Sequence, residues 1–168
     1  MKYQDRVERA VELFKEGYNC SQAVCAAFAD IYGLTFEQAL KVSASFGGGI
    51  GRMRMVCGAA SGMFLLAGLE CGSTDPKDAD AKGANYKVVQ ELAAEFAKRN
   101  GSLICGELLG LVKRGEGSDN IAACANATNA VLNPNPEART EEYYKKRPCS
   151  KMVEEGATIF AEYLEGKE

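Results

Sequence analysis

The chain has 168 residues, of which 46% are apolar and 26% are charged, and its formal net charge is −3. This composition is typical of one globular domain that is large enough to bury a core without disulfide bonds. The mild acidity gives no reason to expect nucleic acid as a partner. The absence of histidine excludes a Ser–His–Asp triad, a Cys–His pair and any histidine-containing metal site. A metal would therefore need cysteine or carboxylate ligands.

The ends and the apolar segments of the sequence predict a cytoplasmic protein without a membrane span. The N-terminal segment MKYQDRVERAVELFKEGY is charged and amphipathic, so it does not resemble a signal peptide. The longest apolar run, 55–69, is too short to cross a bilayer. Cytoplasmic thiols stay reduced unless they are catalytic, sensing or metal-bound. The seven cysteines are an odd number, which argues against a complete framework of structural disulfides.

Helical periodicity dominates the first half of the chain. A first helix is predicted over 3–18, with Gly17 as its stop signal. Asn19 is a suitable N-cap for a second helix that runs to about Tyr32, and Thr35 caps a third that ends near Phe46. The glycine cluster 47–51 then breaks the pattern.

The second half also predicts helices. A fourth helix over about 57–70 is apolar on nearly all sides, which is typical of a buried central helix. Asp75-Pro76 is expected to open a long fifth helix that ends at Asn100-Gly101, and short helices are expected after 105, within 121–130 and within 137–146. A last helix follows Pro148. No segment shows the alternation of apolar and polar residues that is typical of a strand. We therefore predict an all-α, single-domain bundle of about six or seven helices over residues 1–168.

Four of the seven cysteines fall at predicted helix starts: Cys20, Cys57, Cys105 and Cys149. A helix start presents unpaired N–H groups and the positive end of the dipole, which favour a thiolate. The other three lack this setting: Cys25 is in mid-helix, Cys71 is near a helix C-terminus, and Cys124 is in a small-residue segment. We interpret Cys25 as a buried apolar residue.

Cys57 has the strongest local context. The preceding glycine-rich loop can turn its N–H groups inward as an anion nest, and Arg52 and Arg54 add positive potential. Gly58 and Gly62 project no side chain from the following helix. This allows the close approach of a cofactor or partner, or simply tight helix packing. These features make Cys57 the expected low-pKa nucleophile.

The remaining helix-start cysteines have weaker individual contexts. Cys149 follows Lys145, Lys146 and Arg147, which can lower its pKa, although such a run is usually a solvated face. Cys105 can equally be a core residue. No C-x-x-C pair is present, so local spacing does not indicate a zinc ribbon or ferredoxin site. A bundle can still bring one ligand from each of four helix ends.

Several segments together resemble the C_GCAxxG_C_C family, small bacterial and archaeal proteins described as redox-active. These segments are NCSQAVCAAF, SFGGGIGRMRMVCGAASG, CGELLG and RPC, and the resemblance spans about 17–153. The CGAxxG motif corresponds to residues 57–62, and the other family cysteines correspond to Cys20, Cys105 and Cys149. The resemblance implies redox activity without supplying a substrate, and related domains occur in some iron–sulfur proteins.

Three functions remain open from the sequence. In the first, Cys57 is a catalytic nucleophile, and Cys20, Cys105 or Cys149 resolves it as a disulfide for an unidentified redox partner protein. In the second, these four cysteines bind an iron–sulfur cluster for electron transfer, or a metal ion such as zinc. In the third, they are core residues of a partner-binding subunit. A homodimer is expected if a second subunit, rather than the bundle itself, covers the apolar fourth helix.

Overall fold

The computed structural model describes residues 1–115 and 133–167 of the chain. These residues form eight α-helices and two short 3₁₀ turns, and they contain no β-strand beyond an isolated bridge between Val56 and Ile104. The predicted all-α class is confirmed. The helix count exceeds the predicted six or seven, with two of the helices only four and six residues long. None of the described helices has both the length and the apolar character needed to cross a membrane.

The N-terminal helices are α1 (Gln4–Glu16), α2 (Cys20–Phe28) and α3 (Phe36–Ser43). Gly17 ends α1 in the left-handed conformation with φ 111°. Asn19 and Thr35 cap α2 and α3, each in a capping box with the glutamine three residues later. The predicted caps are therefore confirmed, and 3₁₀ turns at Ala29–Tyr32 and Ala44–Phe46 extend both helices to their predicted ends.

The later helices are α4 (Gly58–Cys71), α5 (Ala79–Asn100), α6 (Cys105–Leu108), α9 (Glu141–Lys146) and α10 (Cys149–Glu165). The predicted start of α5 at Asp75-Pro76 is wrong, because Asp78 caps the helix by accepting from the Ala81 N–H at 2.8 Å. Asp75 instead closes a turn by accepting from the Lys77 N–H at 2.9 Å. The helix predicted within 121–130, and Cys124 with it, lies outside the described residues.

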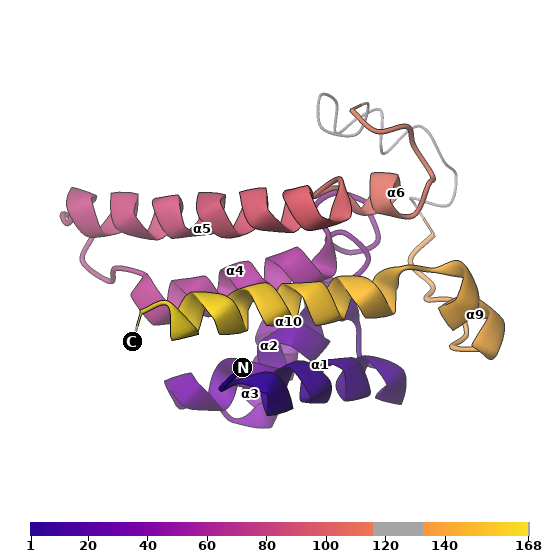
Figure 1. The fold of residues 1–168 in the computed structure, drawn as a ribbon, viewed down its shortest axis with the longest axis horizontal. Coiled ribbons are helices and arrows are strands. Elements are labelled where there is room, and N and C mark those ends of the chain that lie inside the picture. The colour runs from indigo at the N-terminus through magenta and orange to yellow at the C-terminus, as the bar shows by residue number, and fades with distance from the viewer. Residues whose placement is uncertain (116–132, 168) are drawn as a thin grey trace.

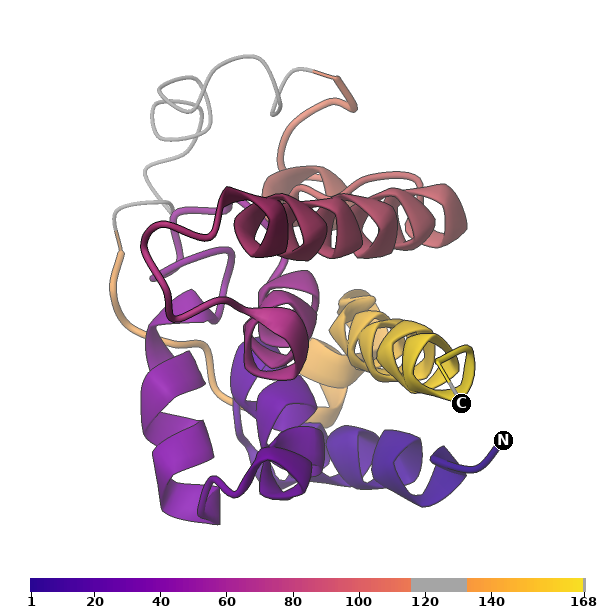
Figure 2. The same cartoon turned by 90° about the vertical axis from the view of Figure 1, so that its left-hand side faces the viewer.

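The helices are arranged in three layers, with α4 and α10 in the middle (Figures 1 and 2). The long helix α5 covers one side of this pair, α1 and α2 cover the other, and α3 packs against α2. The N-terminal half of α4 is buried, from Gly58 to Met63, as predicted for a central helix. Helices of the same chain therefore cover this half of α4.

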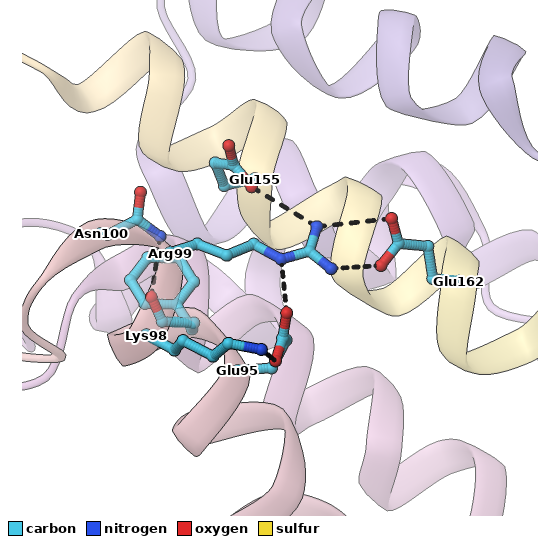
Figure 3. Close-up of polar contacts among 7 residues, drawn as sticks. Glu95, Lys98, Arg99, Asn100, Glu155 and Glu162 are labelled. Atoms are coloured by element: carbon cyan, nitrogen blue, oxygen red, sulfur yellow. Dashed lines mark hydrogen bonds and ion pairs between the residues drawn. The ribbon is translucent and has the colours of Figure 1, made fainter.

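Arg99 links the outer helix α5 to α10 (Figure 3). Its guanidinium group donates to both carboxylate oxygens of Glu162, at 3.4 and 2.5 Å, and to Glu95 on its own helix at 2.8 Å. Glu155 of α10 lies 3.7 Å from the same group. A guanidinium group that pairs with several carboxylates is held in one position more firmly than the side chains of an isolated surface ion pair. The network therefore helps to fix the position of α5 on the middle layer.

Candidate functional site

All four helix-start cysteines line a single cavity of about 410 Å³ at one end of the bundle. Cys20, Cys105 and Cys149 are the first residues of α2, α6 and α10, and Cys57 is the N-cap of α4. The helix-start assignment is thus correct for all four. The loop before α4, α6 and the N-terminus of α10 meet at this end (Figure 1). Segments distant in the sequence therefore contribute sulfur atoms to one space.

Small residues of α4 allow this convergence. A Cβ atom added at Gly58 would lie 3.1 Å from the Cys20 Cβ, and one added at Gly62 would lie 2.8 Å from the Ser21 carbonyl oxygen. Both glycines of the CGAxxG motif thus let α2 approach α4 closely. On another side of α4, a Cβ atom added at Gly156 of α10 would lie 3.1 Å from the Ala59 carbonyl oxygen. The tight-packing interpretation of the glycines is therefore correct, and the packing itself positions the thiols.

Cys20 and Cys149 line the same cavity, and hydrogen bonding between their thiols is the largest cause of the pKa shift of each. Donation from Cys20 lowers the pKa of Cys149 to about 7, against the opposing effect of burial, and the positive charges of Arg147, Arg139 and Arg54 lower it further. The same hydrogen bond, followed by burial, raises the pKa of Cys20 well above its ordinary value. The pair therefore combines one acidic thiol with one protonated donor.

Cys57 is not the acidic thiol that its sequence context predicts. Its side chain is almost fully buried, and this burial raises its pKa to about 12, although the Ala59 and Ala60 N–H groups favour the thiolate. Burial also raises the pKa of Cys105, although Arg54 lies beside it. The predicted low pKa of Cys57 is wrong because, at a buried position, loss of hydration raises the pKa by more than the helix start lowers it. Of the four helix-start cysteines, only Cys149 has a lowered pKa.

The later part of the glycine-rich loop, from Ile50 onward, does not form the expected anion nest. The N–H groups of residues 50–55 all donate to carbonyl oxygens of residues 45–50, so they are occupied within the loop. Residues 48–52 all have positive φ, and so does Arg54 with φ 61°. Ile50 and Arg52 are forced into this region at roughly 1–2 kcal/mol each. The loop contributes charge through a side chain instead, because it directs Arg54 into the protein.

Four arginines line the cavity: Arg52, Arg54, Arg139 and Arg147. Arg54 is only 5% exposed, and its Nη1 lies 3.8 Å from the Cys105 sulfur. Arg139 stacks on the rings of Phe14 and Tyr143 and donates to the Tyr18 carbonyl oxygen at 3.1 Å. Such a concentration of positive charge stabilises a thiolate within the cavity.

The sequence indicated only part of this arginine cluster. Lys145 and Lys146 pair with Glu141 and Glu142 on the surface of α9, so only Arg147 of this basic run lines the cavity. Arg139 had no recognisable signal, because it lies in an irregular segment ten residues before Cys149. Its role depends on aromatic stacking that only the folded chain creates.

The extra cysteines of the described residues do not line the cavity. Cys25 is fully buried in the core, and burial raises its pKa to about 11. Cys71 ends α4, where its thiol contacts the Ala67 carbonyl oxygen at 3.2 Å and accepts from the Asn85 amide at 3.3 Å. The predicted core position of Cys25 is confirmed.

The positions of the cysteine and carboxylate side chains bear on the metal alternative. Within residues 1–115 and 133–167, no group of three or more Cys, His, Asp or Glu side chains has an arrangement that could hold a metal ion. The six cysteines in these residues are free thiols. The four sulfur atoms therefore share a cavity without forming a ligand set, and the metal alternative gains no support from this geometry.

Comparison with known proteins agrees with the cysteine arrangement. The family model described as "Putative redox-active protein (C_GCAxxG_C_C)" matches residues 18–163. The chain belongs to the C_GCAxxG_C_C family. The match covers all four cavity-lining cysteines of this C_GCAxxG_C_C protein and most of its helices. No match is found among the curated proteins or among the solved structures.

Proposed function

We propose that this protein is a thiol–disulfide redox protein whose reactive pair is Cys149 and Cys20. The observation that carries the proposal is that both thiols line one cavity, where their interaction lowers the pKa of Cys149 and raises that of Cys20. A thiolate near neutral pH combined with an adjacent thiol is the arrangement that disulfide exchange requires. The family description supports the same class of chemistry. Cys57 and Cys105 are placed as walls of the cavity rather than as the attacking group.

The exchange proceeds in two displacements. The Cys149 thiolate attacks one sulfur of a substrate disulfide, forming a mixed disulfide and releasing one thiolate. The sulfur of Cys20 then attacks Cys149, forming the Cys20–Cys149 disulfide and releasing the second half of the substrate. The Cys20 proton passes to a released thiolate, and two electrons pass to the substrate. An external dithiol reduces the protein disulfide and closes the cycle.

The first displacement activates the second. The pKa of Cys20 is raised chiefly by its hydrogen bond to Cys149 and by burial, followed by repulsion from the Cys149 charge. Once Cys149 is part of a mixed disulfide, it carries no negative charge. The pKa of Cys20 then falls, because both contributions from the Cys149 thiolate are lost. Cys20 therefore becomes a nucleophile only after substrate has been captured.

Mapping of the disulfide tests this proposal. Reduced protein is treated with one equivalent of hydroxyethyl disulfide, quenched with acid and N-ethylmaleimide, and digested with trypsin. We expect a link between peptides 16–41 and 147–151. Because Cys25 shares the first peptide, the Cys25→Ala variant assigns the link to Cys20. The Cys20→Ser variant should accumulate the mixed disulfide on Cys149.

The same preparation separates the alternatives. Cys71→Ser is the matched control, because Cys71 lies outside the cavity and serine retains its polar contacts. A link that joins other cysteines would overturn the assignment of the reactive pair. Stoichiometric iron and sulfide in protein purified without oxygen, or stoichiometric zinc, would overturn the thiol mechanism in favour of the four-cysteine metal alternative. We expect neither.

A further inference from the structure

The cavity has a charge opposite to that of the whole chain. The chain carries a formal net charge of −3, yet among the residues that the structure describes, four arginines and a single carboxylate, Glu137, line the cavity. That carboxylate is already paired with Arg147. Burial lowers the pKa of Arg52, and repulsion from Arg54 lowers it further, which is consistent with incomplete compensation among these charges. A positive, partly enclosed space of this kind concentrates anions.

Arg54 supplies the most specific indication of a ligand. It is only 5% exposed, and its Nε has no hydrogen-bond partner among the described residues. A buried charged donor without a partner is costly unless water or a bound molecule satisfies it. The backbone around Arg54 is also strained, with positive φ at Ile50, Arg52 and Arg54 itself. The fold thus maintains an unfavourable loop that places the Arg54 guanidinium group, with one unpaired donor, in the wall of the cavity.

A second buried donor lies on another wall. The Nη1 atom of Arg139 is buried and has no hydrogen-bond partner among the described residues, whereas its Nη2 is used by the Tyr18 carbonyl oxygen. The Cζ atom of Arg139 lies 4.4 Å from the centroid of the Phe14 ring and 4.8 Å from that of the Tyr143 ring, and these contacts hold the guanidinium group in place. A fixed guanidinium group with a free N–H matches the geometry of a carboxylate.

The volume of the cavity limits what can enter. About 410 Å³ lies within the range of small-molecule sites and is too small for a folded protein. Cys57 and Cys105 are 5% and 7% exposed, so a flat protein surface could not reach the deeper sulfur atoms. The apolar lining includes Leu108 and Met152, which suits a short carbon chain. The fitting molecule is therefore small, anionic and partly apolar.

We propose that the cavity selects low-molecular-weight disulfides that carry carboxylates, with the carboxylate bound by Arg54 and Arg139 and the sulfur–sulfur bond presented to Cys149. The inference rests on the proposed exchange function for its sulfur chemistry, whereas anion binding itself does not. The reaction is the two-step exchange described above, with the anionic disulfide as oxidant. Arg54 and Arg139 bind substrate and take no part in proton transfer.

Three dialkyl disulfides of similar size test the selectivity: dithiodipropionate, neutral hydroxyethyl disulfide and cationic cystamine. We expect reduced protein to react with dithiodipropionate at least roughly tenfold faster than with the neutral disulfide, and most slowly with cystamine. Added salt should reduce this advantage. Free cysteine serves as the reference thiol for intrinsic reactivity. The rate of each disulfide with the protein is divided by its rate with free cysteine, and equal ratios for all three disulfides would overturn the selectivity.

Substitutions locate the anion site. Arg54→Met should remove about tenfold of the preference for dithiodipropionate over the neutral disulfide. The ratio of the two rates is compared because Arg54 also lowers the pKa of Cys149, so its loss slows reaction with both disulfides. Arg139→Met should act in the same direction and is the second variant if Arg54→Met fails to fold, as judged by circular dichroism. Arg9→Met is the matched control, because Arg9 is an exposed residue of α1 outside the cavity. An unchanged preference in both folded cavity variants would contradict the proposal.

A variant that cannot undergo exchange separates the two proposals. In the Cys20→Ser, Cys149→Ser double variant, calorimetric binding of dithiodipropionate reports the anion site without exchange at the proposed reactive pair. We expect binding that weakens about tenfold on adding Arg54→Met. If the wild-type protein reduces none of the disulfides while this binding persists, the exchange function fails and the anion site stands. If exchange occurs without charge preference and this variant does not bind, only the anion site fails.

Discussion

At the scale of single residues, the chemistry depends on an asymmetry between two neighbouring thiols. Both Cys20 and Cys149 begin helices and are partly buried, yet their pKa values move in opposite directions. The hydrogen bond between them stabilises the thiolate on one side only, and the charges of Arg147, Arg139 and Arg54 lower the pKa of Cys149 further. Cys57 shows the opposite case, because burial there outweighs two N–H donors. Thiol reactivity is therefore set by the balance of hydration and partners rather than by helix position alone.

The pH dependence of alkylation tests this asymmetry. Because the pKa of Cys149 is lowered to about 7, its reaction with iodoacetamide should reach half its maximal rate near pH 7 and should slow as the pH falls below it. Cys20→Ala removes the donor, so the midpoint should move upward toward the ordinary cysteine value. Mass mapping of the modified peptide measures both midpoints. Cys71→Ser should leave the Cys149 profile unchanged, and a midpoint insensitive to Cys20→Ala would contradict the hydrogen-bond explanation.

At the scale of secondary-structure elements, α4 determines how the cavity is assembled. Its glycines and alanines leave room for α2 on one side and α10 on another, so the ends of these helices meet. The loop before α4 adds a second constraint, because a Cβ atom at Gly49 would lie 2.6 Å from the Cys105 Cβ. The CGAxxG motif is thus a packing motif as much as a chemical one. Its cysteine and its glycines act together because close helices bring the thiols together.

A pair of glycine substitutions in α4 tests the packing role. Gly62→Ala should lower the free energy of unfolding by about 1–3 kcal/mol, because the new methyl group would overlap the α2 backbone. Gly68→Ala, in the same helix, meets open space and should raise stability by up to about 1 kcal/mol through helix propensity. Urea unfolding followed by circular dichroism measures both changes. Similar effects of the two substitutions would argue against close α2–α4 packing.

At the scale of the whole molecule, the proposed disulfide would join distant parts of the chain. It would connect α2 near the N-terminus to α10 near the C-terminus and close a loop that contains most of the chain. A cross-link that closes a long loop restricts the unfolded chain strongly, whereas the folded chain already holds these ends together. Formation of the proposed disulfide would therefore raise the stability of the whole domain.

Chemical denaturation tests this coupling. The oxidised protein should unfold at a clearly higher urea concentration than the reduced protein, with a gain on the order of 4–5 kcal/mol for a loop of this length before any strain is subtracted. Cys20→Ala, treated with the same oxidant, should show no such gain. Equal midpoints for the oxidised and reduced wild-type protein would contradict a Cys20–Cys149 bond.

Much of the fold could be predicted from local sequence signals. The caps at Asn19 and Thr35 and the stops at Gly17 and Gly101 are local features, so the sequence located them correctly. The start of α5 was misplaced because Asp75 and Asp78 both resemble caps, and only Asp78 bonds to the first helical turn. The choice between two similar local signals depends on the surrounding chain.

The site was only partly predictable for a related reason. The sequence identified the four cavity cysteines, since each follows a helix-start signal. It selected Cys57 as the acidic thiol because the glycine-rich loop and upstream arginines are visible in the sequence, whereas burial is not. The contact between Cys20 and Cys149 and the stacking of Arg139 depend on tertiary packing. Long-range contacts therefore decide the electrostatics that the sequence leaves open.

The wide separation of Cys20 and Cys149 along the chain has a consequence during protein synthesis. Cys20 leaves the ribosome long before Cys149 has been translated, and no acidified thiol exists until the two meet. A nascent chain therefore lacks the acidic thiol until α10 has been made and has docked beside α2. On the proposed mechanism, exchange would begin only once the whole domain has folded.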